Sequence, residues 1–315
     1  MLLKGKKALI MGVANKRSIA WGIAAAFHRE GAELAFTYQN ERLKENLDEL
    51  LDTIGGRASF LTYPADVAVD EQLDGLFADL GDRWGRLDVL AHCIAYADRD
   101  DLLRPVTEMS RDGFALTMNI SAYSLPAVAR RAVRLMAGGG SIFTLTYNAV
   151  ERVVPGYNVM AIAKAALETE VRYLASELGP GSVRVNAISA GPLKTLAGSA
   201  VKGISKLRDL TAEMAPLRRN ITIEDVGDVA VFLASDLSKA VTGNTLYVDS
   251  GFHIMGMASL PGGSALATRQ GLATAACSRA HHSKRSRWDR SKSMTLPSIC
   301  SDVSTAARNF SGWDS

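Results

Sequence analysis

The chain has 315 residues, of which 47% are hydrophobic and 22% are charged, a balance that suits a soluble globular protein of one large α/β domain or two smaller ones. The N-terminus lacks the features of a secretory signal, and no apolar run approaches the roughly 20 residues of a membrane span. Three cysteines without disulfide or metal-site spacing favour a reducing cytoplasm, and we expect no metal.

The net charge of +3 is unevenly distributed. Residues 258–315 carry eight basic and three acidic side chains, a net charge of +5, so residues 1–257 carry −2. The first 257 residues therefore give no indication of a nucleic-acid partner.

Residues 1–257 alternate short apolar, β-branched runs with helical patterns. In chain order, a strand is predicted over 7–12, a helix over 18–31, a strand over 32–38 and a helix over 41–54. Further strands are predicted within 57–66, 87–94, 141–147 and 183–189. Short buried strands that alternate with helices predict βαβ units and a parallel sheet. We therefore expect an α/β fold with one Rossmann-type, doubly wound domain.

The regular pattern stops near residue 257. Residues 258–315 are rich in Ser, Ala, Gly and Arg and have no sustained period, so we expect a disordered basic extension. A tail that contacts a membrane, a nucleic acid or an acidic protein is the functional alternative. The second alternative is that the extension is solvated and has no function, or that it comes from a shifted reading frame.

A glycine turn follows the first strand in "MGVANKRSIAWGIA", residues 11–24. A glycine between a strand and a helix N-terminus is typical of a pyrophosphate site, because the backbone approaches the anion and free N–H groups face it. The usual G-x-G-x-x-G is absent, and the small residues are Gly12, Ala14, Ser18, Ala20 and Gly22. A tight turn without ligand remains the structural alternative.

The second strand ends at Gln39, where dinucleotide-binding sheets place a ribose ligand. Gln39 can bond a hydroxyl but offers a 2′-phosphate no charge, although Arg42 and Lys44 are close in sequence. Asp66 and Val67 follow the third strand, where they could meet an adenine. We interpret Cys93, which follows the fourth strand, as a buried small side chain rather than a nucleophile.

Tyr157 and Lys164 lie seven residues apart in "PGYNVMAIAK". On an α-helix this spacing places both side chains on one face, about 10.5 Å apart along the axis. A nearby cation makes a phenol a better hydrogen-bond donor or acid. Alternatively, the two side chains lie at the edges of an amphipathic helix and have no chemical role.

These stretches, together with "NAISAGPLKT" (186–195) and "VTGNTLYVDSGF" (241–252), resemble the short-chain dehydrogenase/reductase superfamily. Most members carry Y-x-x-x-K. The longer spacing here, with Tyr147 ten residues before Tyr157, is similar to the NADH-dependent enoyl-acyl-carrier-protein reductases of bacterial type II fatty-acid synthesis. The resemblance covers residues 1–257 and excludes the tail.

The resemblance implies reduction of the trans-2 double bond of an enoyl thioester by hydride transfer from NADH to C3, with NADPH left open. It implies that Tyr147, Tyr157 and Lys164 are catalytic and that Ala95, Tyr147 and Tyr157 contact substrate. Matching the family position by position assigns cofactor contacts to Gly12, Ala14, Ser18, Ile19, Gln39, Asp66, Val67, Ile94, Lys164, Leu193 and Thr195.

Residues 193–207 resemble the substrate lid of this family, and Lys202, Lys206 and Arg208 would steer an acidic acyl carrier protein. A solvated helix face is the alternative explanation of these charges. The resemblance also implies a homotetramer in the cytoplasm.

Two other functions stay open at this stage. One is an oxidoreductase of the same fold that acts on a ketone or alcohol. The missing Y-x-x-x-K motif argues against it, because Ala161 stands four residues after Tyr157, where that motif has its lysine. The other is a non-catalytic nicotinamide-binding paralogue, which the intact Tyr157 and Lys164 argue against.

Overall fold

The computed structural model describes residues 1–195 and 204–257. Residues Met1–Ser259 belong to one compact unit, and the tail predicted from residue 258 lies outside the described residues. Within the described ranges, no helix is long and apolar enough to cross a membrane.

Seven parallel strands form one sheet in the order β3-β2-β1-β4-β5-β6-β7. The strand order turns back at β1 and β4, as it does in a doubly wound sheet, so the predicted fold class is confirmed. The strands are β1 (Lys7–Met11), β2 (Glu33–Tyr38), β3 (Leu61–Pro64), β4 (Val89–His92), β5 (Gly140–Thr146), β6 (Val183–Ala190) and β7 (Thr245–Val248).

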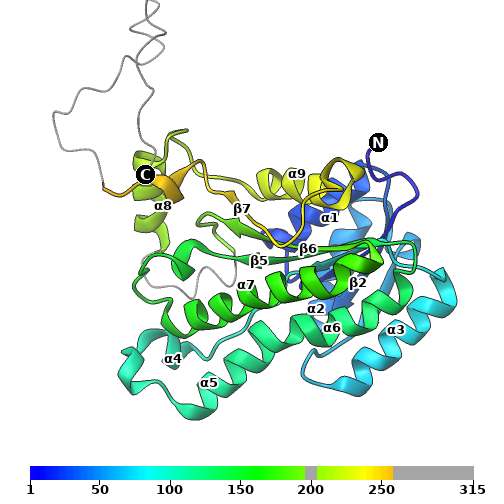
Figure 1. The fold of residues 1–315 in the computed structure, drawn as a ribbon, viewed down its shortest axis with the longest axis horizontal. Coiled ribbons are helices and arrows are strands. Elements are labelled where there is room, and N and C mark those ends of the chain that lie inside the picture. Colours follow the sequence, from blue (N-terminus) through cyan, green and yellow to red (C-terminus); the bar gives the residue numbers. More distant parts are fainter. Residues whose placement is uncertain (196–203, 258–315) are drawn as a thin grey trace, which may run out of the picture. The chain divides into compact units, whose positions relative to one another are not determined.

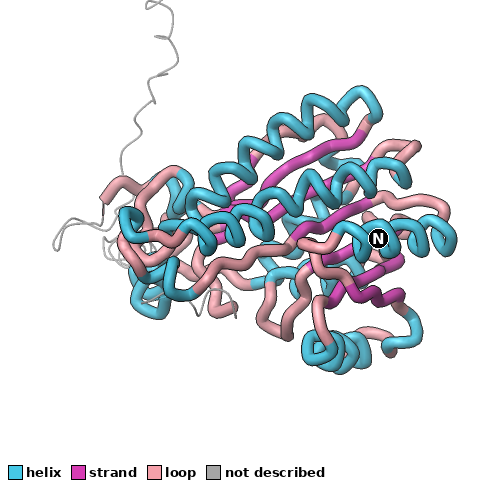
Figure 2. Tube along the Cα trace, turned by 90° about the horizontal axis from the view of Figure 1, so that it is seen from below, coloured by secondary structure: helices cyan, strands magenta, loops and turns pink. Residues whose placement is uncertain are grey.

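Helices cover both faces of this sheet (Figures 1 and 2). Those described are α1 (Ile19–Arg29), α2 (Glu41–Asp52), α3 (Asp70–Trp84), α4 (Arg99–Leu103), α5 (Arg111–Met118), α6 (Ser124–Ala132), α7 (Asn158–Leu178), α8 (Ile204–Met214) and α9 (Ile223–Ala234). Helices α1, α2 and α9 pack on one face, and α3, α6 and α7 pack on the other.

Alternation along β1 shows why two layers form. Ala8 and Ile10 contribute to the core on one face, and Leu9 and Met11 contribute to the core on the other. Successive side chains of a strand point to opposite faces, so a strand buried on both faces is apolar at every position.

Several helix ends follow local sequence rules. Asn40 accepts from the Leu43 N–H at the start of α2, and Thr222 and Asp225 form a reciprocal capping box at the start of α9. Helix α1 starts directly after Ser18, as predicted. Gly31, just beyond its end, has a φ of +83°, which favours glycine.

Candidate functional site

The predicted glycine turn lies against the end of β4. Gly12 has a φ of +94°, and a Cβ at this position would lie 2.2 Å from the Cys93 carbonyl oxygen. Only glycine fits there, because both the dihedral angle and the neighbouring backbone exclude a side chain. The amide of Asn46 in α2 donates to the Ala14 carbonyl at 3.1 Å, which fixes the far side of the turn.

The N-terminus of α1 retains free backbone donors. The Ser18 hydroxyl donates back to the Asn15 carbonyl at 2.6 Å and makes no cap bond to the helix. The N–H of Trp21 donates to the Ser18 carbonyl, so the N–H groups of Ile19 and Ala20 stay available to an anion, and the helix dipole favours negative charge there. This donor set fits a dinucleotide pyrophosphate.

The next two strands bring Gln39 and Asp66 together. The Gln39 amide donates to the Asp66 carboxylate at 3.0 Å, and Val67 packs against the core beside them. Lys44 is ion-paired with Asp48 of its own helix at 2.7 Å, so the Asp48 carboxylate already balances the charge of this lysine. Arg42 is exposed, and Gln39 itself offers a ribose hydroxyl a neutral hydrogen-bond partner and a 2′-phosphate no charge.

Residues 94–97 continue from β4 and are held by one serine that sequence reasoning missed. Ser121 Oγ accepts from the Tyr96 N–H at 2.8 Å and donates to the Tyr96 carbonyl at 2.7 Å. This two-point contact fixes the backbone next to Ile94 and Ala95, both predicted to line the site. Ser121 lies in a π-helical turn, Asn119–Tyr123, between α5 and α6.

A buried hydrogen-bond chain supports the same strand ends. The His92 ring lies between Thr144 Oγ1 at 3.0 Å and Ser124 Oγ at 2.8 Å, and the Ser124 hydroxyl donates to the Ile120 carbonyl at 2.6 Å. Burial lowers the pKa of His92 to about 3, and the Lys164 charge adds to this effect, so the ring is neutral. A histidine at the end of the apolar run "VLAH" was the sequence signal for this chain.

The residues predicted to be catalytic lie where β5 meets the start of α7. Tyr147 follows β5, and Tyr157 is the N-cap residue of α7. Their rings meet edge to face, with centroids 5.0 Å apart. Lys164 lies two turns further along α7 among Met160, Ala163, Leu167 and other inward residues, so it is only 4% exposed. The shared face of Tyr157 and Lys164 stays a prediction, because Tyr157 is the N-cap residue and its backbone is not helical.

Burial determines the protonation of this group. It raises the pKa of the Tyr157 phenol well above its usual range and that of Tyr147 to about 12, so both are neutral donors at neutral pH. Burial lowers the pKa of Lys164 to about 8, and its Nζ donates to the Leu145 carbonyl at 2.8 Å. The pKa of the Cys93 thiol rises to about 12, which agrees with a non-nucleophilic role.

A small apolar cluster adjoins Tyr157, and the sequence did not reveal it. Leu102 of α4 packs there with Val159 and Met160 of α7, and the partly buried Ala97 and Met109 join them. These residues come from separate segments, so no local pattern marks them. The cluster provides an apolar wall beside the phenol.

The remaining predicted residues lie after β6. Leu193 packs against the core, and Thr195 is half-buried. The predicted lid, 193–207, is only partly covered, since residues 196–203, including Lys202, lie outside the described residues. Lys206 is exposed on α8, and Arg208 is half-buried on it.

This geometry agrees with comparisons to known proteins. Residues 12–253 match the family model described as Enoyl-(Acyl carrier protein) reductase. The chain belongs to this family. The resemblance seen in the sequence is therefore confirmed, and the matched range contains the glycine turn, Tyr147, Tyr157 and Lys164.

Curated relatives in the family cover the same part of the chain. The enoyl-[acyl-carrier-protein] reductase [NADH] FabI of Bacillus cereus is 54% identical over 255 residues, which is 81% of this chain and 99% of the relative. The enzyme of the same name from Aquifex aeolicus is 51% identical over 257 residues, 81% of this chain and 94% of the relative.

Solved structures of the family share the fold. The enoyl-acyl carrier protein reductase of Bacillus cereus, solved with NADP+ and indole naphthyridinone, aligns with a TM-score of 0.80 at 53% identity, covering 81% of this chain and 99% of that one. The reductase of Anaplasma phagocytophilum, solved with NAD, aligns with a TM-score of 0.79 at 46% identity, covering 82% and 98%.

Proposed function

We propose that this chain reduces the trans-2 double bond of an enoyl-acyl-carrier-protein thioester with NADH, the last reduction of a fatty-acid elongation cycle. One observation carries the proposal: a neutral Tyr157 phenol at the N-cap of α7 and a buried Lys164 within α7, in a member of the enoyl-acyl-carrier-protein reductase family. Bound NADH supplies the hydride that the substrate receives at C3.

The first strands provide the residues for the cofactor. The free N–H groups of α1 beside Gly12 and Ser18 would bind the pyrophosphate. Gln39 and Asp66, already hydrogen-bonded to each other, would bind the adenosine end. Ile94, Leu193 and Thr195, with the residues near them, would line the nicotinamide end. Preference for NADH follows from the absence of charge on Gln39.

Tyr157 would act on the substrate as a hydrogen-bond donor. Hydride addition at C3 leaves negative charge on the thioester oxygen as an enolate, and a proton from solvent then adds at C2 to complete the reduction. A neutral phenol donates to that oxygen without releasing its proton, and loss of one such donor costs about 2.7–4 kcal/mol. Tyr147, edge to face with Tyr157, and Ala95 would border the acyl group, with the apolar wall around Leu102 and Met160 beside them.

Lys164 would supply the positive charge and bind the nicotinamide ribose hydroxyls. Its Nζ already donates one bond to the Leu145 carbonyl, which leaves the other ammonium protons for a ligand. Acyl carrier protein is the expected partner, and the exposed Lys206 and half-buried Arg208 of α8 would steer its acidic surface. Lys202 would join them.

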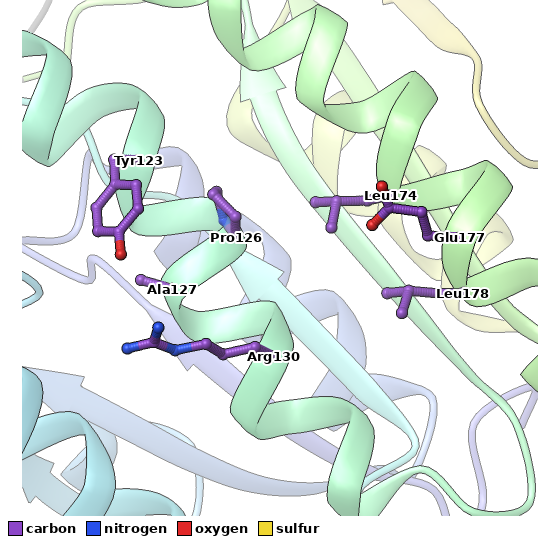
Figure 3. A pocket seen from close by; sticks show the side chains of 7 residues that line it. All are labelled: Tyr123, Pro126, Ala127, Arg130, Leu174, Glu177 and Leu178. Carbon is purple, nitrogen blue, oxygen red and sulfur yellow. The ribbon is translucent and has the colours of Figure 1, made fainter.

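We also propose a homotetramer in the cytoplasm. Exposed apolar side chains of α5 to α7, namely Phe114, Tyr123, Ile162 and Tyr173, support a contact with a second copy. Figure 3 shows a hollow between α6 and α7 next to Tyr123, lined by Pro126 and Leu174 among others. The size of the full chain and of a chain ending at Met257 tests the assembly, and monomers in both would exclude it.

The function is tested by NADH oxidation with a trans-2-enoyl thioester. We expect turnover by the wild type, and we expect Lys164→Ala to lose NADH binding and turnover together. A wild type that binds NADH but leaves the enoyl thioester unchanged would exclude the proposal. Turnover of a ketone or alcohol in its place would favour the alternative oxidoreductase.

A further inference from the structure

Two neighbouring residues at the end of β5 hold two residues that are one turn apart on α7. The Leu145 carbonyl accepts from Lys164 Nζ at 2.8 Å, and the Thr146 hydroxyl donates to Glu168 Oε1 at 2.7 Å. The spacing of Lys164 and Glu168 is i,i+4, which places both side chains on one side of the helix. Tyr147 follows directly in the chain, so this contact also anchors the residues predicted to be catalytic.

The buried ammonium needs a compensating negative charge. An ionised lysine loses its hydration when it is buried, and a carbonyl dipole replaces only part of it. The Glu168 carboxylate acts on Lys164 through space and favours its charged form. Cys93 also faces Lys164, but its thiol is protonated at neutral pH and carries no charge.

We propose that Glu168, oriented by Thr146, is a positioning residue that keeps Lys164 charged and in place for the cofactor. The inference rests on the proposed role of Lys164 in NADH binding. Glu168 lies outside the predicted site, and its carboxylate would act on the cofactor only through Lys164, without contact to the reacting atoms.

The other charged and titratable groups around the pair oppose or support this effect. Facing Lys164 from β4 is His92, which is neutral. Facing Glu168 are Glu151 from the segment after β5, Arg172 one turn further along α7, and Tyr247 of β7. Burial raises the pKa of Glu168, and Glu151 adds to this, whereas Thr146, Arg172 and Lys164 favour the ionised carboxylate.

Unfolding of the protein without cofactor gives the first test. Lys164 releases its proton near pH 8 when folded and near pH 10.5 when it is exposed to water in the unfolded chain. Between these values the unfolded chain holds more protons, so the lysine's contribution to the free energy of unfolding rises with pH. Subtracting the free energy of unfolding of Lys164→Met from that of the wild type at each pH isolates this rise. In a Glu168→Gln background we expect the rise to begin at lower pH.

NADH binding, followed by fluorescence against pH, gives the second test. Above its pKa the charged fraction of Lys164 falls about tenfold per pH unit. We expect Glu168→Gln to lose affinity at lower pH than the wild type. Thr146→Val should lie between the two, and Thr146→Ser should restore the wild-type profile because it keeps the hydroxyl.

Glu170→Gln is the matched control. Glu170 lies on the same helix, and its pKa is raised by burial without a contribution from Lys164. Identical profiles for Glu168→Gln and Glu170→Gln, or a loss of NADH affinity by the same factor at every pH, would overturn the proposal. Absence of NADH binding by the wild type would instead remove the proposed function, and the unfolding series would still decide the role of Glu168.

Discussion

At the ends of β1 and β2, the predicted cofactor contacts are backbone N–H groups and the exposed Gln39 side chain. At the ends of β4 and β5, several polar side chains are buried beneath the half-buried Tyr147 and Tyr157. His92 and Thr144 are fully covered, and Lys164 is nearly so. We call the first region the nucleotide side and the second the reaction side.

The difference matches the ligand that each side is proposed to bind. A pyrophosphate is held by backbone donors and a helix dipole, which require a particular backbone path rather than buried charge. An enolate requires a donor in a dry environment, where hydrogen bonds act more strongly. We therefore expect substitutions on the nucleotide side to act through geometry and those on the reaction side to act through protonation.

The largest effect is expected for Gly12→Ala on the nucleotide side. The added Cβ meets the Cys93 carbonyl, and φ is positive, so we expect a loss of roughly 2–4 kcal/mol in the free energy of unfolding, with weaker NADH binding. Gly5→Ala is the control, since its φ is also positive but a Cβ there meets nothing within 4 Å. If urea denaturation showed equal losses of unfolding free energy for Gly12→Ala and Gly5→Ala, the close approach of Gly12 to the end of β4 would not be the cause.

His92→Phe tests protonation on the reaction side. His92 takes up a proton only near pH 3 in the folded protein, against pH 6.5 for a histidine exposed to water. Between these values the unfolded chain holds more protons, so stability falls as pH falls, by up to about 1.4 kcal/mol per unit. Thr144 and Ser124 can still donate to backbone carbonyls in the variant. We expect a shallower decline for the variant in urea titrations from pH 6.5 to 4; parallel curves would contradict a neutral buried ring.

Gln39→Arg should change cofactor choice without disturbing the reaction side. A guanidinium at this position would meet a 2′-phosphate, so we expect the ratio of kcat/KM for NADPH to that for NADH to rise about tenfold, or about 1.4 kcal/mol. Lys44→Gln is the control, because Lys44 is already paired with Asp48. If Lys44→Gln changed the NADPH-to-NADH ratio more than Gln39→Arg does, the 2′-phosphate would lie nearer to Lys44 than to Gln39.

Tyr147→Phe should have the smallest effect. The variant keeps the edge-to-face contact with Tyr157 and loses only a hydroxyl. We expect kcat for an enoyl thioester to fall by less than about threefold, or roughly 0.7 kcal/mol. A loss as large as that of a direct oxyanion donor would make Tyr147 an equal partner in the reaction.

The sequence predicted the fold well because local patterns determine it. Strands buried on both faces are continuous apolar runs, and Ser18 and Gly31 mark the ends of α1. Element bounds were less accurate: residues 57–66 contain a 3-10 turn, Arg57–Ser59, followed by β3 over only Leu61–Pro64. Short strands stop where ladder partners stop, and the sequence does not show this.

The site was predictable to the extent that it lies within one element. Tyr157 caps α7 and Lys164 lies within it, so their spacing was enough to draw attention to the pair. Ser121 and the Thr146–Glu168 contact join segments distant in sequence, and no period marks them. The roles of the individual cofactor and substrate residues stay predictions.

Single-turnover reduction of a trans-2-enoyl thioester by Tyr157→Phe, compared with Tyr147→Phe, tests the central claim most directly. A neutral phenol that stabilises the enolate oxygen should make Tyr157→Phe about 100-fold slower or worse than the wild type, with NADH affinity unchanged. A Tyr157→Phe variant that reacts as fast as Tyr147→Phe would contradict the account, since the enolate would then be stabilised by another group.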